Sequence, residues 1–269
     1  MSIRVGIIGG QGQMGQWFKR FFEEQGLDVL VTGSSTTPFS PEVARQVDVA
    51  IISVPIHITE KTIREIAPYL RPEALLMDLT SLKKDPVAAM LQYFPGEVIG
   101  THPLFGPGLE SIKGSIMVLC PGRGERWFNW LHDLLTRAGA IIQITTPEEH
   151  DLMMSVVQGL THFILIAMGT TLRNLDTKVN ELDNFATPTF RKLFGQVQHL
   201  FNQKSDLYAC IQLRNQANQV ILAAFEAAVA DIRRIVANQD AEGLISLLQE
   251  NRRFFNGFKL VEPASMSNG

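Results

Sequence analysis

The sequence has few cysteines and little net charge. Its 269 residues include only two cysteines, Cys120 and Cys210, and 24 basic against 27 acidic residues give a formal net charge of −3. Two distant cysteines are too few for a disulfide framework, so we expect buried thiols in a reducing cytosol. The balanced charge provides neither a basic surface for nucleic acid nor a field that would hold an anionic membrane.

Long apolar runs are scarce as well. No run approaches the roughly 20 residues of a membrane span, and the richest stretch, residues 163–171, is short and has polar flanks. The first eight residues lead into a strand without the apolar core of a signal peptide. We therefore expect a soluble, cytoplasmic protein without a membrane partner, and we predict no metal site.

Short apolar runs alternate with amphipathic stretches over the first half of the chain, which is typical of βα units on a parallel sheet. The runs predict strands over residues 4–8, 28–32, 47–54, 74–78, 97–100, 116–120 and 140–144. Helices are predicted between them over residues 13–25, 59–70, 87–93 and 125–138.

The pattern changes after Pro147, where only long helical periods follow. They cover residues 148–175, 188–201, 207–237 and 241–255. We therefore predict a nucleotide-binding domain over residues 1–146, an all-helical substrate and dimerisation domain over 147–260, and a flexible tail over 261–269.

A glycine-rich turn directly follows the first predicted strand and opens the first predicted helix. Gly10, Gly12 and Gly15 fit the G-x-G-x-x-G pattern, in which a tight turn lets the backbone and a helix N-terminus approach a pyrophosphate. The predicted fold class is thus α/β, a Rossmann-type, doubly wound, mostly parallel sheet followed by the helical domain. The predicted dinucleotide contacts are Gly10, Gln11, Gly12, Gln13, Met14, Gly15, Val54 and Pro55.

The end of the second predicted strand bears on the choice between NAD and NADP. A carboxylate there would bind the ribose hydroxyls of NAD and repel a 2′-phosphate. This chain instead has Gly33, Ser34, Ser35 and Thr36, whose small hydroxyl side chains can surround a phosphate. We therefore favour NADP, with NAD as the alternative.

Candidate catalytic residues follow the carboxyl ends of the fourth and fifth predicted strands, where ligands bind in such folds. His102 comes after the fifth strand, and a histidine suits the removal of a hydroxyl proton near neutral pH. Ser81, one strand away, could orient its imidazole, and Lys83 could meet a substrate carboxylate. A solvated loop histidine is the competing interpretation of His102.

Four motifs, in this order and spacing, resemble those of prephenate dehydrogenases. They read Gly-Gly-x-Gly-x-Met-Gly at 9–15, Ser-Val-Pro-Ile-His at 53–57, Asp-Leu-x-Ser-x-Lys at 78–83 and His-Pro-x-Phe-Gly-Pro at 102–107. The likeness is strongest to the dehydrogenase half of bifunctional chorismate mutase/prephenate dehydrogenases and continues through Glu149–His150–Asp151 and residues 158–163. The chain leaves no room for a mutase domain, so we expect a monofunctional enzyme.

The resemblance implies NAD(P)-dependent oxidative decarboxylation of prephenate or arogenate in tyrosine biosynthesis, by a homodimer formed through the helical domain. It further implies that His102 accepts the proton of the ring hydroxyl, that Ser81 supports His102, and that Lys83 positions substrate or cofactor. Gln158 and His162 would face the substrate, although packing between helices explains these two side chains equally well.

The chain departs from the family where an arginine is expected to grip the ring carboxylate. Arg191 matches one arginine of that segment, but His199 stands where the gripping arginine is expected. Histidine lacks the bidentate fork of arginine and most of its charge at neutral pH. Either Arg191 or Arg214 takes over, or the substrate is a modified ring such as an amino-deoxy-prephenate.

Two further alternatives stay open. A non-catalytic nucleotide-binding homologue could share the fold, although it would have no reason to keep Ser81, Lys83 and His102 together. A hydroxyacid dehydrogenase with a lysine base is a weaker competitor, because Lys178 and Lys192 lie outside a Gly-x-x-x-Lys helix setting.

Overall fold

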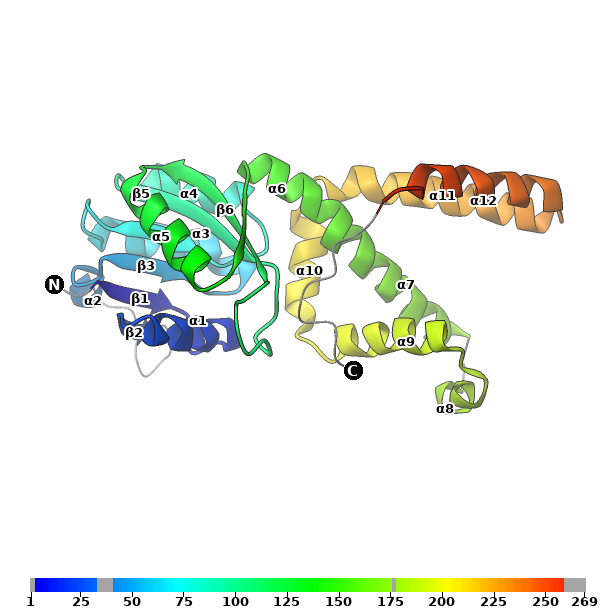
Figure 1. The fold of residues 1–269 in the computed structure, drawn as a ribbon, viewed down its shortest axis with the longest axis horizontal. Helices are drawn as coiled ribbons and strands as arrows, with labels where there is room; N and C mark the ends of the chain where they lie inside the picture. Colours follow the sequence, from blue (N-terminus) through cyan, green and yellow to red (C-terminus); the bar gives the residue numbers. More distant parts are fainter. Residues whose placement is uncertain (1–2, 33–40, 176–177, 259–269) are drawn as a thin grey trace. The chain divides into compact units, whose positions relative to one another are not determined.

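The computed structural model describes residues 3–32, 41–175 and 178–258 and comprises two compact units (Figure 1). The first unit contains Met1–Met154 together with Lys204–Ile211, and the second contains Ser155–Gln203 and Gln212–Gly269. The predicted domain boundary near residue 146 stays a prediction.

The first unit is built on one seven-stranded sheet with the order β2-β1-β3-β4-β5-β6-β7. All neighbouring strands are parallel except β5 and β6, which confirms the predicted Rossmann-type sheet. The chain leaves β1 for β2 on one side and then returns to β3 on the other, so the topological switch point lies between β1 and β3. The strands are β1 (Arg4–Ile8), β2 (Asp28–Thr32), β3 (Val49–Ile52), β4 (Leu75–Asp78), β5 (Glu97–Pro103), β6 (Ile116–Arg123) and β7 (Ile141–Ile144).

Helices cover both faces of this sheet, as a doubly wound fold requires. On one face, α1 and α5 pack against side chains such as Val49 and Ile51 of β3. On the other, α3 and α4 pack against Ala50 and Ile52 of the same strand, which explains why the strand reads as an unbroken apolar run. The helices are α1 (Gln13–Glu24), α2 (Pro41–Ala44), α3 (Ile56–Ile66), the short η1 (Ala67–Tyr69), α4 (Lys84–Tyr93), α5 (Arg126–Arg137) and α6 (Pro147–Met154).

The described residues of the second unit are helical and contain no strand, as predicted. Helix α7 packs against α9, and α11 packs against η2 and α12. The elements are η2 (Ser155–Leu160), α7 (Thr161–Asn174), α8 (Val179–Leu182), η3 (Asp183–Phe185), α9 (Pro188–Phe201), α11 (Asn218–Ala237) and α12 (Ala241–Phe255), while α10 (Ser205–Arg214) begins in the first unit.

The helix predicted over 207–237 is broken into α10 and α11. Asparagine side chains compete for backbone groups and thereby favour turns. At the break, the Asn215 side-chain oxygen accepts a hydrogen bond from the Ala217 amide (3.1 Å), and the Asn215 carbonyl accepts one from the Asn218 amide (3.1 Å). The apolar periodicity continues across this turn, which is why the sequence alone does not reveal it.

Elements α6, η2 and α7 form one continuous helix, Pro147–Asn174. By length and composition alone this helix could cross a membrane, and only 22% of its most apolar window is buried within the chain. The expectation that no apolar stretch approaches that length was therefore wrong. Isolated polar residues break the sequence into short apolar runs, but the mean hydropathy over a longer window of the helix stays high.

Candidate active site

The glycine-rich turn after β1 is packed tightly on one side and open on the other. Gly9 has φ +78°, and a Cβ atom there would lie 2.4 Å from the Ser53 carbonyl oxygen. A Cβ on Gly15 would lie 2.4 Å from the Gly10 Cα. At Gly12, by contrast, the single neighbour of an added Cβ is the Gly9 carbonyl oxygen at 3.3 Å. Gly12 therefore presents bare backbone to solvent between two closely packed glycines.

Helix α1 begins at this open side with its amide groups available. Gly12 is its N-cap, no side chain caps it, and its first turn has no acidic residue. The first amides of a helix lack intrahelical acceptors and form the positive end of its dipole, which favours an anion. Gln11, Gly12 and Gln13 are exposed here. The turn and the helix thus fit the pyrophosphate of a dinucleotide.

The loop after β3 lies against the same turn at the switch point. A Cβ on Gly9 would lie 2.7 Å from Val54 Cγ1, and the Ser53 amide donates to the Ile8 carbonyl (2.8 Å). Pro55 is exposed and precedes α3 as its N-cap. The predicted contacts from Gly10 to Gly15 and at Val54 and Pro55 therefore meet at one edge of the sheet. Gly33, Ser34, Ser35 and Thr36 lie outside the described residues.

A buried polar network joins the carboxyl ends of β4 and β5. Asp78, the last residue of β4, pairs with the ammonium group of Lys83 and accepts from the Thr80 amide (3.0 Å) and the Thr101 amide (3.2 Å). Lys83 Nζ also donates to the Thr101 carbonyl (2.6 Å), and its side chain has no exposed surface. The expectation that Lys83 meets a substrate carboxylate therefore does not agree with this arrangement, in which Lys83 ties the two strand ends together.

His102 lies within β5 and is only 3% exposed. The sequence suggested that β5 ends at Gly100, but antiparallel pairing with β6 extends it and sets His102 opposite Val118. The imidazole Nδ1 lies 2.9 Å from His150 Nε2. The alternative of a solvated loop histidine does not agree with this burial.

His150 and Asp151, in the middle of α6, complete a buried chain of hydrogen bonds. His150 Nδ1 lies 2.7 Å from Asp151 Oδ1. The Asp151 carboxylate also accepts from the backbone amides of Lys83 (2.8 Å) and Lys84 (3.0 Å) at the start of α4. In the sequence these two residues stand out only as part of a family motif, and no role is predicted for them. The adjacent histidine and aspartate were the available signal.

Burial is the main influence on the His102 imidazole. Burial lowers its pKa well below the usual 6.5, and the nearby His150 and Lys83 lower it further. His102 is therefore neutral at neutral pH and can accept a proton. The buried Cys120 thiol, whose pKa burial raises to about 12, stays protonated and unreactive.

Ser81 is half-buried on the segment between Asp78 and Lys83. Within the part of the chain that the structure describes, its hydroxyl has no hydrogen-bond partner. The His102 imidazole contacts His150, whereas the sequence had suggested Ser81 as its support.

Gln158 and His162 lie one turn apart where η2 meets α7. Element η2 is a π-helical turn, a feature often found at functional sites. Gln212 Nε2 donates to the Gly159 carbonyl (2.9 Å), and Asn218 Nδ2 donates to the Gln212 carbonyl (3.1 Å). Burial lowers the pKa of His162. The roles of Gln158 and His162 in substrate binding stay predictions.

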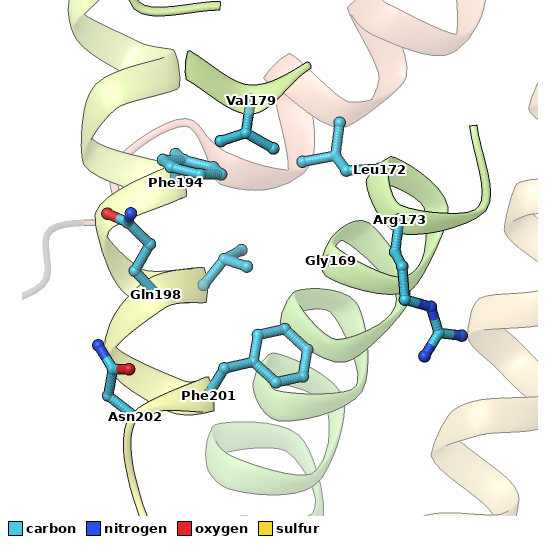
Figure 2. A pocket seen from close by; sticks show the side chains of 9 residues that line it. Gly169, Leu172, Arg173, Val179, Phe194, Gln198, Phe201 and Asn202 are labelled. Atoms are coloured by element: carbon cyan, nitrogen blue, oxygen red, sulfur yellow. The ribbon is translucent and has the colours of Figure 1, made fainter. Parts of the chain in front are cut away.

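Arg191 lies far along the second unit from these residues. Its guanidinium pairs with the Asp183 carboxylate and donates to the Asp183 carbonyl (2.9 Å). Helices α7 and α9 flank a pocket of about 490 Å³ in which Phe201 lies by Gly169 and Phe194 by Leu172 (Figure 2). The two helices are therefore antiparallel, and about 16 Å of α7 separates His162 from Arg173 at the end where α9 begins. The structure does not bring Arg191 to Gln158 and His162.

No group of three metal-ligating side chains occurs among residues 3–32, 41–175 and 178–258. A switch-point glycine turn and an uncapped helix N-terminus together define a Rossmann-type nucleotide-binding protein. A buried neutral histidine lies at the same edge of the sheet.

Comparison with known proteins identifies the family. Models of the prephenate dehydrogenase nucleotide-binding domain and dimerization domain match residues 23–144 and 146–250. A "T-protein" from Haemophilus influenzae is 31% identical, and the match covers 95% of this chain and 68% of that protein. The chain belongs to the prephenate dehydrogenase family.

Two further similarities agree with this assignment. A probable arogenate/prephenate dehydrogenase from Methanocaldococcus jannaschii is 34% identical over 94% of this chain, which spans only 61% of that protein's length. The fold matches the crystal structure of a prephenate dehydrogenase from A. aeolicus in complex with hydroxyphenyl propionate and NAD+. That match has a TM-score of 0.77 and 18% identity and covers 94% of this chain and 97% of the other.

Proposed function

We propose that this protein catalyses the NAD(P)-dependent oxidative decarboxylation of prephenate or arogenate. The observation that carries the proposal is His102, a buried, neutral histidine at the carboxyl end of β5 in a chain of this family. Such a group can take the proton of a ring hydroxyl while the ring carbon loses hydride. Loss of CO2 then makes the ring aromatic, and the reaction is effectively irreversible.

The residues divide this work between binding and proton transfer. Gly12 and the amides that open α1 would hold the pyrophosphate, and the loop at Val54 and Pro55 would border the nicotinamide. When bound, the nicotinamide supplies the hydride acceptor. The Ser81 hydroxyl is available to a ligand, and Lys83 acts from behind the site by joining β4 to β5.

NADP is the proposed cofactor in preference to NAD. The support is the sequence at Gly33, Ser34, Ser35 and Thr36, which has no carboxylate to repel a 2′-phosphate. The ratio of kcat/KM for the two cofactors tests this choice, and a higher value with NAD would contradict it.

For the ring carboxylate, the geometry favours His199 over Arg191. Eight residues of α9 separate them, or about 12 Å along the helix axis. Arg191 is already paired with Asp183, whereas His199 is exposed near the end of α9 that lies by Gly169. This order differs from the sequence-based expectation that Arg191 or Arg214 takes over from His199.

We further propose a cytoplasmic homodimer formed through the second unit. The apolar helix Pro147–Asn174 is largely uncovered within one chain, and the matching family model describes a dimerization domain. A second copy would cover this helix without a membrane.

The decisive experiment follows absorbance at 340 nm with prephenate and arogenate, each with NAD+ and NADP+. We expect reduced cofactor and CO2 in at least one combination. The His102→Asn variant should lower kcat by about 10²–10⁴-fold, as is usual for loss of a general base, with cofactor affinity unchanged. Absence of cofactor reduction in all four combinations would contradict the proposal, and normal turnover of the variant would remove His102 from the mechanism.

A second candidate substrate is a ring that carries an amino group in place of the hydroxyl. The observation in its favour is His199 at the position where a gripping arginine is expected. The same assay with 4-amino-4-deoxyprephenate distinguishes the two, because a higher kcat/KM for the amino substrate would favour this candidate.

A further inference from the structure

We propose that His150 and Asp151 are positioning residues that fix the tautomer of His102, so that its Nδ1 carries the proton and its Nε2 carries the lone pair. The proposal rests on the proposed role of His102 as a base. It assigns a function to two side chains that the sequence analysis left without one.

The Asp151 carboxylate faces hydrogen-bond donors. The Lys83 amide donates to Oδ1 (2.8 Å) and the Lys84 amide donates to Oδ2 (3.0 Å), both at the positive end of α4. A carboxylate in this environment accepts hydrogen bonds. The 2.7 Å contact with His150 therefore requires the proton to reside on His150 Nδ1.

A His150 ring with a single proton holds that proton on Nδ1, where the Asp151 carboxylate accepts the hydrogen bond. His150 Nε2 is then an acceptor, and its 2.9 Å neighbour, His102 Nδ1, must donate. His102 in turn has its one proton on Nδ1, which leaves the lone pair on Nε2. His102, His150 and Asp151 are 3%, 2% and 9% exposed, so the chain of hydrogen bonds is shielded from bulk water.

The Asp151 carboxylate contacts both the His150 ring and the backbone amides at the start of α4. Asp151 holds the start of α4, and the segment just before α4 carries Ser81 and Lys83. One side chain thus fixes both the proton on His102 and the backbone beside it. This arrangement gives a reason for the adjacent histidine and aspartate in the middle of α6.

The first test reads the tautomer directly in the protein labelled with ¹⁵N-histidine. Long-range ¹H–¹⁵N spectra at neutral pH should show His102 protonated at Nδ1, with its signals assigned by their loss in His102→Asn. In Asp151→Asn, the carboxamide can donate to His150 Nδ1, which would reverse both rings and place the His102 proton on Nε2. A wild-type His102 protonated on Nε2 would overturn the proposal.

The second test compares turnover among matched variants. Asp151→Asn should lower kcat by on the order of 10²–10⁴-fold, because the base nitrogen is protonated. His150→Gln should retain most of kcat, since its side-chain oxygen still accepts from His102 Nδ1, whereas His150→Leu should lose it. The control is Asp85→Asn, which removes an exposed carboxylate from the first turn of α4 without touching the chain.

Cofactor Kd and thermal unfolding separate positioning from folding. We expect an unchanged Kd in every variant, and an unchanged tautomer with a lower Tm in Asp151→Asn would show a merely structural role and overturn the proposal. If the wild-type protein reduces neither cofactor with either substrate, the proposed function fails, but the spectra still decide the tautomer.

Discussion

The His102 side chain shows how burial sets chemistry at the scale of one residue. Burial lowers its pKa, and His150 of α6 and Lys83 of the loop before α4 add to the effect. A base works only when it is unprotonated, so kcat/KM should fall with decreasing pH only once pH drops below the usual 6.5. The measurement is kcat/KM across the acidic and neutral range, with cofactor Kd over the same range as the control.

The sign of the corresponding effect on stability follows from linkage. As pH falls below 6.5, the unfolded chain takes up a proton at His102 before the folded chain does. This contribution to stability is therefore complete above pH 6.5 and is lost as pH falls toward the lowered pKa.

For the kinetic prediction, an acid limb of kcat/KM centred at or above pH 6.5 would contradict the assignment of His102 as the buried base.

His199 and Arg191 lead to a second prediction at this scale. His199→Ala should raise the KM of the substrate, because the ring carboxylate loses a hydrogen-bond donor, which costs about 1–3 kcal/mol. His199→Arg should preserve binding, because a guanidinium offers the ring carboxylate a bidentate pair of donors. Arg191→Ala is the control, and a large increase in its KM alone would restore Arg191 as the carboxylate partner.

Individual site residues differ in how far the sequence could predict them. The glycines follow β1 directly, and local order was enough to place them. The partner of His102 could not be predicted in this way, because His150 lies 48 residues later and reaches it only when α6 packs beside β5. The sequence suggested Lys83 as a substrate contact, because residue type alone does not show that its ammonium group pairs with the Asp78 carboxylate.

At the scale of elements, a substitution in the turn that joins β1 to α1 can change dinucleotide affinity without changing the stability of the fold. Gly12→Ala meets little within the protein but places a methyl group where the pyrophosphate approaches. We expect Kd for the dinucleotide to rise by about tenfold or more, about 1.4 kcal/mol, with an unchanged Tm. Isothermal titration and thermal unfolding provide these two measurements.

Gly15→Ala is the matched comparison, because its added carbon would lie 2.4 Å from the Gly10 Cα. Backbone must shift to accept it, so this variant should lose about 1–3 kcal/mol of stability as well as affinity. Equal Tm values for the two variants, or unchanged affinity in Gly12→Ala, would contradict this interpretation of the turn.

The order and type of most elements could be predicted, since apolar periodicity changes clearly after Pro147. Element ends could not always be predicted. Strand β5 gains Thr101, His102 and Pro103 by pairing with β6, a long-range effect absent from local pattern. The turn at Asn215 depends on a side-chain hydrogen bond that apolar periodicity does not report.

At the scale of the whole molecule, exposed apolar side chains of the second unit predict self-association. Ile245 and Leu248 on α12 are 54% and 60% exposed. Light scattering after size-exclusion chromatography should give twice the 30.0 kDa of one chain. Replacing both residues with glutamate should shift the protein toward the monomer by burying unpaired charge.

Ile144→Glu serves as the control, because Ile144 is similarly exposed (49%) but lies on β7 of the first unit. It should leave the mass of the assembly unchanged. A wild-type protein that elutes as a monomer at all concentrations would contradict the dimer.

The chain passes between its two units three times, after Met154, after Gln203 and after Ile211. On its return it buries Ile211 against Ile56 and Leu82, beside the loops that follow β3 and β4. A gene fragment ending at residue 146 would encode the full sheet and the glycine turn but lack this cover, and it would also lack His150 and Asp151. A single crossover in the gene could therefore not exchange the complete nucleotide-binding unit. Part of that unit, Lys204–Ile211, is encoded within the helical half of the chain.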